Sequence, residues 1–180
     1  MIKKIVSLLE KTCSQCRPLV ELYSSPYMRV VQNEIDLAHI TAADRVLNIG
    51  CGAIPFTAIL IARLTGAQVV AVDRDPQAAQ LAQNCVQKTG LGHLIQIVHG
   101  DGSQRMPERF DVAVIALQAE PRAQILSSLF SSGQEGRRIV TRLPSEPFRN
   151  QYDPMPHDYP IAAQVPQAMK TFDRSVLIMA

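Results

Sequence analysis

The sequence predicts an α/β fold, in which one doubly wound domain with a mostly parallel sheet follows a short helical cap. From Arg45 onward, apolar runs rich in β-branched residues alternate with amphipathic stretches. This is the βαβα rhythm of a parallel sheet with helices on both faces. Three of the apolar runs, at 46–49, 69–72 and 112–117, are apolar throughout except at Asn48 and do not alternate, as expected for central strands that are covered on both sides.

Size and charge narrow the class of protein. A chain of 180 residues is long enough for one domain with its own core and too short for two of ordinary size. The formal net charge is only +2 and no run of five like charges occurs, so neither nucleic acid nor a membrane surface is expected as a partner. Glu10 and Lys11 interrupt the first apolar run before it reaches the length of a signal-peptide core, which favours a cytoplasmic protein.

Residues 1–44 are expected to form the helical cap, because their apolar residues recur at helical spacing. Pro18 and Pro26 are expected to break this cap into separate helices. Cys13 and Cys16 have the spacing of half a zinc site, but no second pair of ligands completes it. Free thiols are therefore expected, and no metal site is predicted.

Glycines and prolines mark the ends of the later helices. Gly66 and Gly90 each end an apolar-periodic stretch and supply the left-handed residue that commonly closes a helix. Pro76 and Pro121 mark the starts of two helices. The connecting helices are therefore expected within 55–66, 76–90 and 121–130.

The C-terminal part is expected to complete the sheet. A fifth strand is predicted at 138–143. The segment 143–160 holds five of the twelve prolines and is interpreted as a long loop, a feature that is usually functional or mobile. The last apolar runs, 160–166 and 175–180, are interpreted as further strands, the final one as an antiparallel partner.

The strongest local motif is a glycine turn after the first strand. Gly50 and Gly52 remove side chains where the backbone must turn sharply and let a ligand approach. The next helix begins near Pro55 and offers free N–H groups that suit a carboxylate. The plain alternative is a strand-to-helix turn that needs glycine for geometry alone. Dinucleotide-binding turns have a third glycine where this chain has Pro55, which disfavours a nicotinamide cofactor.

Acidic residues follow the second and third strands. Asp73 lies 23 positions after Gly50, which suits a carboxylate that accepts hydrogen bonds from the two hydroxyls of a ribose. The alternative role for Asp73, the N-cap of the next helix, is better suited to Asp75. Asp101 follows the third strand in the same way. We therefore expect these strand ends to converge on one crevice.

Together these features resemble class I S-adenosylmethionine-dependent methyltransferases. The resemblance covers 45–143 and includes the glycine turn, the two acidic residues and the Phe-Asp-Val sequence that opens the fourth strand at 110–112. It implies a Rossmann-like domain over 45–180 that binds S-adenosylmethionine and transfers its methyl group to a small-molecule acceptor. The resemblance is also compatible with a homodimer.

The resemblance also implies roles for individual residues. In this family the acidic residue after the third strand contacts the adenine amino group, which assigns that role to Asp101. The family often has an acidic residue where this chain has Asn48. The cofactor-binding residues that the resemblance implies are Asn48, Gly50, Cys51, Gly52, Asp73, Arg74, Asp101, Gly102 and Leu117.

A narrower resemblance links the glycine turn to nicotianamine synthases, which use the same cofactor as a donor of its aminocarboxypropyl group. Residues 50–57 are similar to the Gly-x-Gly-Pro-x-Pro-x-Thr turn of those enzymes, with matches at Pro55 and Thr57 but not at Ala53. The helical N-terminal domain of that family is much longer than the 44 residues that precede the sheet here. Two further stretches that resemble those enzymes are 21–27 and 173–178.

Glu21, Tyr23 and Tyr27 are the candidates for a catalytic base or a group that orients the acceptor. They precede the core and are expected to fold over the carboxyl ends of the strands, where open α/β sheets bind ligands. Alternatively, the two tyrosines pack an N-terminal helix with their hydroxyls at the surface. Two other functions stay open: aminocarboxypropyl transfer, and a non-catalytic module that binds the nucleoside.

Overall fold

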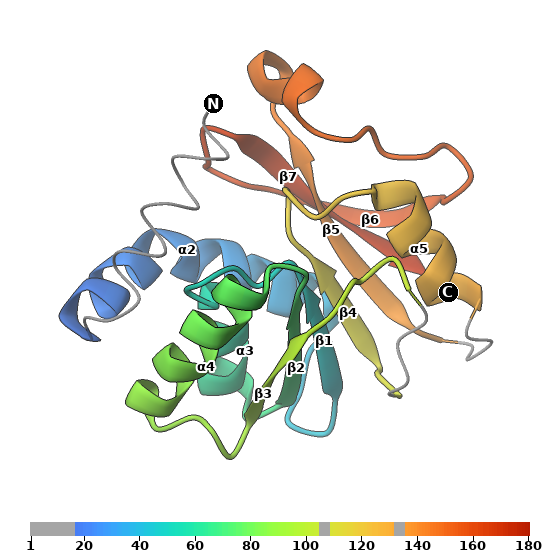
Figure 1. The fold of residues 1–180 in the computed structure, drawn as a ribbon. Coiled ribbons are helices and arrows are strands. Elements are labelled where there is room, and N and C mark those ends of the chain that lie inside the picture. The colour runs from blue at the N-terminus through green and yellow to red at the C-terminus, as the bar shows by residue number, and fades with distance from the viewer. Residues whose placement is uncertain (1–16, 105–108, 132–135) are drawn as a thin grey trace.

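The computed structural model describes residues 17–104, 109–131 and 136–180, with side chains from Tyr27 onward. Its core is a seven-stranded sheet (Figure 1). The strands are β1 (Arg45–Ile49), β2 (Gln68–Asp73), β3 (Ile95–His99), β4 (Val112–Ile115), β5 (Arg138–Pro144), β6 (Ile161–Pro166) and β7 (Phe172–Met179).

The sheet order is β3-β2-β1-β4-β5-β7-β6, and the first five strands are all parallel. The last two strands are antiparallel to their neighbours, because β7 pairs with β5 and β6 pairs with β7 in that sense. The prediction of a mostly parallel sheet with an antiparallel final partner is therefore confirmed. The parallel strands all end at the same edge, and the site lies there.

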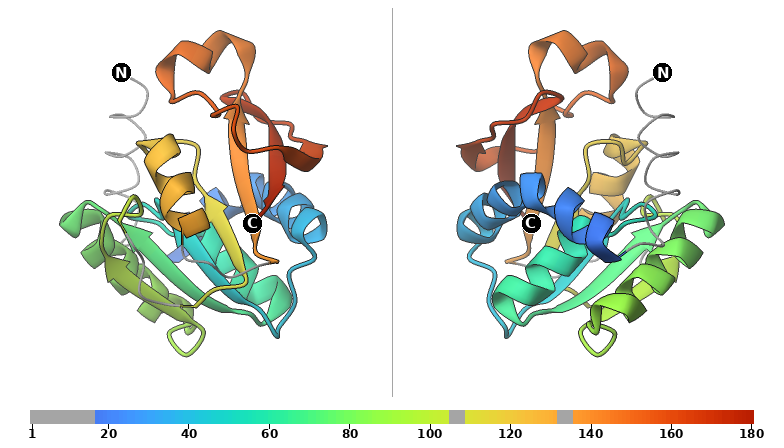
Figure 2. Two further views of the ribbon diagram at one scale, coloured as in Figure 1. Left: turned by 90° about the vertical axis from the view of Figure 1, so that its right-hand side faces the viewer. Right: turned by 90° about the vertical axis from the view of Figure 1, so that its left-hand side faces the viewer.

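Helices cover both faces of the sheet, as the perpendicular views of Figure 2 show. The helices α2 (Arg17–Ala38), α3 (Phe56–Thr65) and α4 (Pro76–Thr89) pack on one face, where apolar residues of all three share a core with the sheet. On the other face, α5 (Arg122–Ser131) packs against the strands through Ile125, Leu126 and Leu129. Burial on both faces explains the continuously apolar strands.

The helix ends follow the sequence signals. Gly66 and Gly90 are left-handed C-caps with φ of 76° and 75°. Helix α4 begins at Pro76, and α5 begins at the residue after Pro121. The Asp75 carboxylate caps α4 by accepting hydrogen bonds from two backbone N–H groups of its first turn, at 2.9 and 3.3 Å.

Three expectations about element bounds were wrong. Pro26 does not divide the cap, since it lies inside α2, which is continuous from Arg17 to Ala38. The fourth strand ends at Ile115 instead of Leu117, because the chain turns away there toward the pocket. The proline-rich loop begins with a 3-10 helix, η1 (Glu146–Gln151), which proline tolerates near its start.

Candidate cofactor pocket

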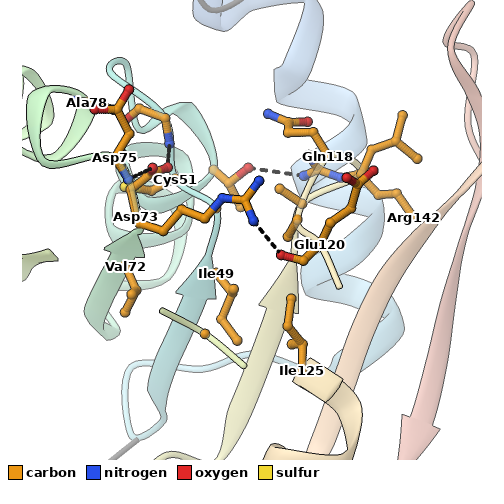
Figure 3. A pocket seen from close by; sticks show the side chains of 18 of the residues that line it. Ile49, Cys51, Val72, Asp73, Asp75, Ala78, Gln118, Glu120, Ile125 and Arg142 are labelled. Atoms are coloured by element: carbon orange, nitrogen blue, oxygen red, sulfur yellow. Dashed lines mark hydrogen bonds between the residues drawn. The ribbon is translucent and has the colours of Figure 1, made fainter. Parts of the chain in front are cut away.

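A cavity of about 400 Å³ lies at the carboxyl ends of the parallel strands. Its wall is built by the turns that follow β1, β2, β3 and β4, and Figure 3 shows it from close by. The structure brings together eight of the nine cofactor-binding residues that the sequence implied. Those that line the cavity are Gly50, Cys51, Gly52, Asp73, Arg74, Asp101, Gly102 and Leu117.

The glycine turn brings bare backbone to the cavity wall. Gly50 and Gly52 have φ of 77° and 68°, in the left-handed region that favours glycine. A Cβ at Gly50 would lie 3.2 Å from the Cβ of Ala119, so a side chain there would also press on Ala119. The turn is anchored to the neighbouring strand, because the N–H groups of Gly50 and Cys51 donate to the Val72 carbonyl at 2.9 and 3.1 Å.

Asp73 braces this turn from the end of β2. Its Oδ2 accepts a hydrogen bond from the Gly52 N–H at 2.7 Å, and its Oδ1 accepts one from the Asp75 N–H at 3.0 Å. These bonds hold the plane of the carboxylate fixed at the cavity wall. Since Asp75 caps α4, the structure settles the alternative role of Asp73 against an N-cap.

Asp101 presents a second carboxylate to the same cavity. Its Oδ1 accepts hydrogen bonds from the backbone N–H and the hydroxyl of Ser103, at 2.9 and 2.8 Å. These two bonds, the backbone one first, hold the pKa of Asp101 below its usual value. No described residue donates to Oδ2, which is therefore available to a ligand.

Arg74 spans the cavity mouth. Its side chain is exposed, and Nη1 donates to the carbonyl oxygen of Glu120 at 3.0 Å, which joins the end of β2 to the segment after β4. Leu117 lies on that segment and lines the cavity.

Asn48 is the one implied cofactor residue that does not line the cavity. Its side chain is 1% exposed and lies within the sheet, where Nδ2 donates to the Val114 carbonyl of the neighbouring strand at 3.1 Å. The structure therefore places Asn48 in a strand-bridging position and not on the cavity wall.

Of the three catalytic candidates, only Tyr27 has a described side chain. It lines the cavity and stacks on Phe56, with ring centroids 5.7 Å apart and planes 6° from parallel. Glu21 and Tyr23 lie in α2, and their side chains fall outside the described residues. Tyr152, the residue that follows η1, also lines the cavity. Burial raises the pKa of Tyr152, and the nearby Tyr27 raises it further.

The structure adds a buried ion pair that the sequence analysis missed. Arg142 of β5 lines the cavity, and its Nε and Nη2 donate to the two carboxylate oxygens of Glu34 in α2, each at 2.8 Å. The side chains are 6% and 0% exposed. Two features of the sequence could have indicated this pair: a charged residue within an apolar strand, and another within the apolar stripe of a helix. Such charges are rarely buried without a partner.

Cys51 and Cys85 are buried, and neither forms a disulfide within the described residues. Burial raises the pKa of Cys85 to about 11. In the part of the chain that the structure describes, no group of three or more His, Cys, Asp or Glu residues is placed to hold a metal ion. No helix in the same ranges combines the length and apolarity needed to cross a membrane.

Comparison with known protein families finds a match over most of the chain. The family model of protein-L-isoaspartate(D-aspartate) O-methyltransferase (PCMT) matches residues 18–153. L-histidine 2-aminobutanoyltransferase of Yersinia pestis is 30% identical over 135 residues, which are 73% of this chain and 50% of that protein. Protein-L-isoaspartate O-methyltransferase of Aeropyrum pernix is 29% identical over 109 residues, 58% of this chain and 42% of that one. The chain thus spans half or less of these curated relatives.

Solved structures show the same fold. A variant of the nicotianamine synthase MtNAS in complex with S-adenosylmethionine has a TM-score of 0.83 at 23% identity, over 96% of this chain and 71% of that one. An RNA methyltransferase from Salinibacter ruber, in complex with S-adenosylhomocysteine, has a TM-score of 0.66 at 19% identity, over 84% of this chain and 90% of that one. The resemblance to class I methyltransferases, with a further likeness to nicotianamine synthases, is confirmed.

Proposed function

The chain belongs to the protein-L-isoaspartate(D-aspartate) O-methyltransferase (PCMT) family, and from this premise we propose that it binds S-adenosylmethionine and transfers the methyl group to a small molecule. The observation that carries the proposal is the meeting of three strand ends on one cavity, where Gly50, Asp73 and Asp101 all lie. The volume of about 400 Å³ is in the range of small-molecule sites.

The residues present fit this cofactor. The two carboxylates provide acceptors for the donors of an adenosyl group: hydroxyls at Asp73 and the adenine amino group at Asp101. Oδ2 of Asp101, which has no donor among the described residues, supports this role. The bare backbone at Gly50 and Gly52 allows the close approach that a bound ligand needs.

S-adenosylmethionine supplies an activated alkyl group for an in-line displacement at carbon. The contribution of this chain is to orient the reactants and to exclude water. Tyr27 and Tyr152 are placed for that task, since both line the cavity and Tyr27 lies close enough to Tyr152 to raise its pKa. We assign them to the acceptor's surroundings and propose no catalytic base among the described residues.

A second function, aminocarboxypropyl transfer, is favoured by a specific observation. The relative from Yersinia pestis that is 30% identical over 135 residues is named for transfer of an aminobutanoyl group to L-histidine. The same cavity serves either reaction, because the difference lies only in which carbon of the cofactor faces the acceptor. A third possibility, a module that binds the nucleoside without turnover, differs from both in having no product.

Product identity separates these functions. The protein is incubated with S-adenosylmethionine and pools of small amines, amino acids and carboxylic acids, and the nucleoside product is identified by mass spectrometry. S-adenosylhomocysteine supports methyl transfer, and methylthioadenosine supports aminocarboxypropyl transfer. Binding of S-adenosylmethionine without either product favours the binding module. Absence of binding, measured by calorimetry, refutes the proposal as a whole.

A further inference from the structure

Arg122, the first residue of α5, is a buried cation that forms no ion pair with any described residue. The residue is 0% exposed, and its Nε has no hydrogen-bond partner in the part of the chain that the structure describes. Burial lowers the pKa of Arg122, although the nearby carboxylates of Asp153 and Glu120 raise it. A charge in such a place costs stability, and residues that break this rule are expected where function requires them.

The guanidinium of Arg122 joins two strands at the point where they separate. β4 and β5 pair as far as Ile115 and Thr141, and β4 ends there. Beyond this point, Nη2 donates to the Leu117 carbonyl at 3.0 Å, and Nη1 donates to the Arg142 carbonyl at 2.9 Å. Nη1 also donates to the hydroxyl of Thr141 at 3.3 Å. Because a guanidinium is planar and rigid, it fixes the distance between the two carbonyls.

Both carbonyls belong to residues of the cavity wall. Every residue of the segment 116–120, which follows β4, lines the cavity, and Arg142 lines it from β5. The same segment lies against the glycine turn, because a Cβ at Gly50 would lie 3.2 Å from the Cβ of Ala119 and 3.3 Å from that of Ala116. A shift of this segment would therefore change both the width of the cavity and the packing of the turn.

The backbone of Arg122 adds a third connection. Its N–H donates to Oδ2 of Asp153 at 3.0 Å, which satisfies one N–H group in the first turn of α5. Asp153 follows Tyr152, which lines the cavity. One residue thus connects three stretches of chain that contribute to the cavity wall: the segment 116–120, the end of β5 and the loop after η1.

We propose that Arg122 is a positioning residue of the cofactor pocket, whose side chain holds the segment 116–120 at a fixed distance from the end of β5. Arg122 does not line the cavity itself, so it acts through this wall and not by contact with a ligand. The inference rests on the proposed function, which places a nucleoside at Asp73 and Asp101. Figure 3 shows Gln118 on the side of the pocket away from Asp73, so the wall that Arg122 holds surrounds the rest of the cofactor.

The test removes the guanidinium in Arg122→Met. Methionine keeps an unbranched apolar stem and takes away a buried charge, so the variant is expected to fold. S-adenosylhomocysteine and methylthioadenosine, which lacks the amino-acid arm, are titrated calorimetrically into the wild type and the variant. The variant is expected to bind S-adenosylhomocysteine about tenfold more weakly, the size of one lost hydrogen bond or a comparable packing contact, and methylthioadenosine less than about threefold more weakly.

The ratio of the two affinities separates positioning from stability. A partly unfolded variant binds both nucleosides more weakly by the same factor, because only the folded fraction binds. A misplaced wall lowers the affinity for the nucleoside that reaches it and leaves the other nearly unchanged. The ratio therefore reports on the wall.

Arg137→Met is the matched control. Arg137 is 4% exposed and, like Arg122, donates to a backbone carbonyl, that of Leu129, from Nη1 at 3.1 Å. It immediately precedes β5, at the edge of the sheet opposite the cavity, and does not line the cavity. This substitution is expected to lower the free energy of unfolding, measured by urea denaturation, without changing the ratio of the two affinities.

Arg122→Lys separates the reach of the side chain from its charge. Lysine keeps a buried charge, but its single ammonium does not hold two carbonyls in a fixed geometry, so the loss of S-adenosylhomocysteine affinity is expected to persist. A wild-type ratio in the lysine variant, or a ratio in folded Arg122→Met equal to that of Arg137→Met, refutes the positioning role. Should Arg122→Met not fold by circular dichroism, the lysine variant decides alone.

The two proposals fail differently. A wild-type protein that binds neither nucleoside refutes the proposed function and the positioning role with it. A wild-type protein that binds S-adenosylhomocysteine, with a ratio of affinities that the Arg122 variants leave unchanged, refutes the positioning role alone and leaves the cofactor assignment standing.

Discussion

Asp73 combines a structural role with its proposed binding role. Its two oxygens accept hydrogen bonds from the N–H groups of Gly52 and Asp75, so the same carboxylate that braces the glycine turn faces the cavity. Each oxygen keeps a second lone pair for a ligand hydroxyl. The hydrogen bonds from the two N–H groups keep the side chain rigid before the ligand binds.

We predict that Asp73→Ala weakens the binding of S-adenosylhomocysteine by about 1 to 3 kcal/mol, because a charged hydrogen-bond partner is lost. Isothermal titration calorimetry measures the change. Asp36→Ala is the control, since Asp36 is an exposed carboxylate of α2 that does not line the cavity. Unchanged affinity in a folded Asp73 variant removes this residue from the proposed cofactor site.

Gly102 is required by packing. A Cβ built at this position lies 2.4 Å from Cγ2 of Ile49, a buried and stiff β-branched side chain. Gly102→Ala is therefore expected to lower the free energy of unfolding by about 1 to 3 kcal/mol, as overpacked substitutions do. Urea denaturation measures it, with Gly92→Ala as the control, because a Cβ there meets nothing within 4 Å. Equal stability of the two variants would contradict this explanation.

At the scale of single elements, helix α4 depends on its cap. Asp75 satisfies two N–H groups of the first turn. Asp75→Ala is expected to lower the free energy of unfolding by about 1 kcal/mol, the usual cost of losing an aspartate N-cap. The comparison is with Gln80→Ala, an exposed substitution on the same helix. A cap variant as stable as this control argues against the cap's contribution.

Helix α2 depends on long-range polar contacts as well as on apolar packing. Glu34 joins it to β5 and β7, and Gln167 donates to the Val30 carbonyl at 3.3 Å and to Ser175 at 3.1 Å. These contacts fix the helix that carries Tyr27 over the cavity. The helical N-terminal cap is therefore part of the site, although it precedes the sheet in sequence.

At the scale of the whole molecule, acid sensitivity follows from a few carboxylates. Burial raises the pKa of Asp44, but hydrogen bonds from Thr41 and the contact with Arg138 outweigh it, so that the net pKa is lowered. The pKa of Asp101 is also lowered, by its bonds from Ser103. A carboxylate with a depressed pKa in the folded state stabilises the fold above the unfolded pKa and loses that contribution as the pH falls through the folded one.

We predict that the melting temperature falls as the pH is lowered from about 5 to about 2.5, the window below the unfolded pKa of an aspartate. Differential scanning fluorimetry across this range measures the change. Asp44→Asn is expected to flatten part of the dependence, because the variant has no proton to gain at this position, and Asp158→Asn, at an exposed aspartate, is expected not to. Identical dependences of the melting temperature on pH in the two variants would show that Asp44 does not contribute to the acid sensitivity.

Sequence patterns were sufficient for most of the elements and for the part of the cavity wall that the ends of the first three strands form. Gly66 and Gly90 close helices as expected, and Asp73, Asp101 and the glycine turn meet at one edge, because parallel strands carry their carboxyl ends to the same place. These features follow local rules, because the type of a residue and its spacing in the sequence are enough to predict them. The helix that continues through Pro26 shows the limit of such rules, since a local preference did not decide the outcome there.

Only the tertiary structure decided which charges meet. Glu34 and Arg142 are 108 positions apart, and no pattern of either segment indicates the other. Their pairing depends on how α2 docks on the sheet, which is a property of the packed molecule. The same packing places Arg142 on the cavity wall. Local sequence thus determined where a nucleoside is expected to bind, and long-range packing determined that a buried ion pair lies beside that cavity.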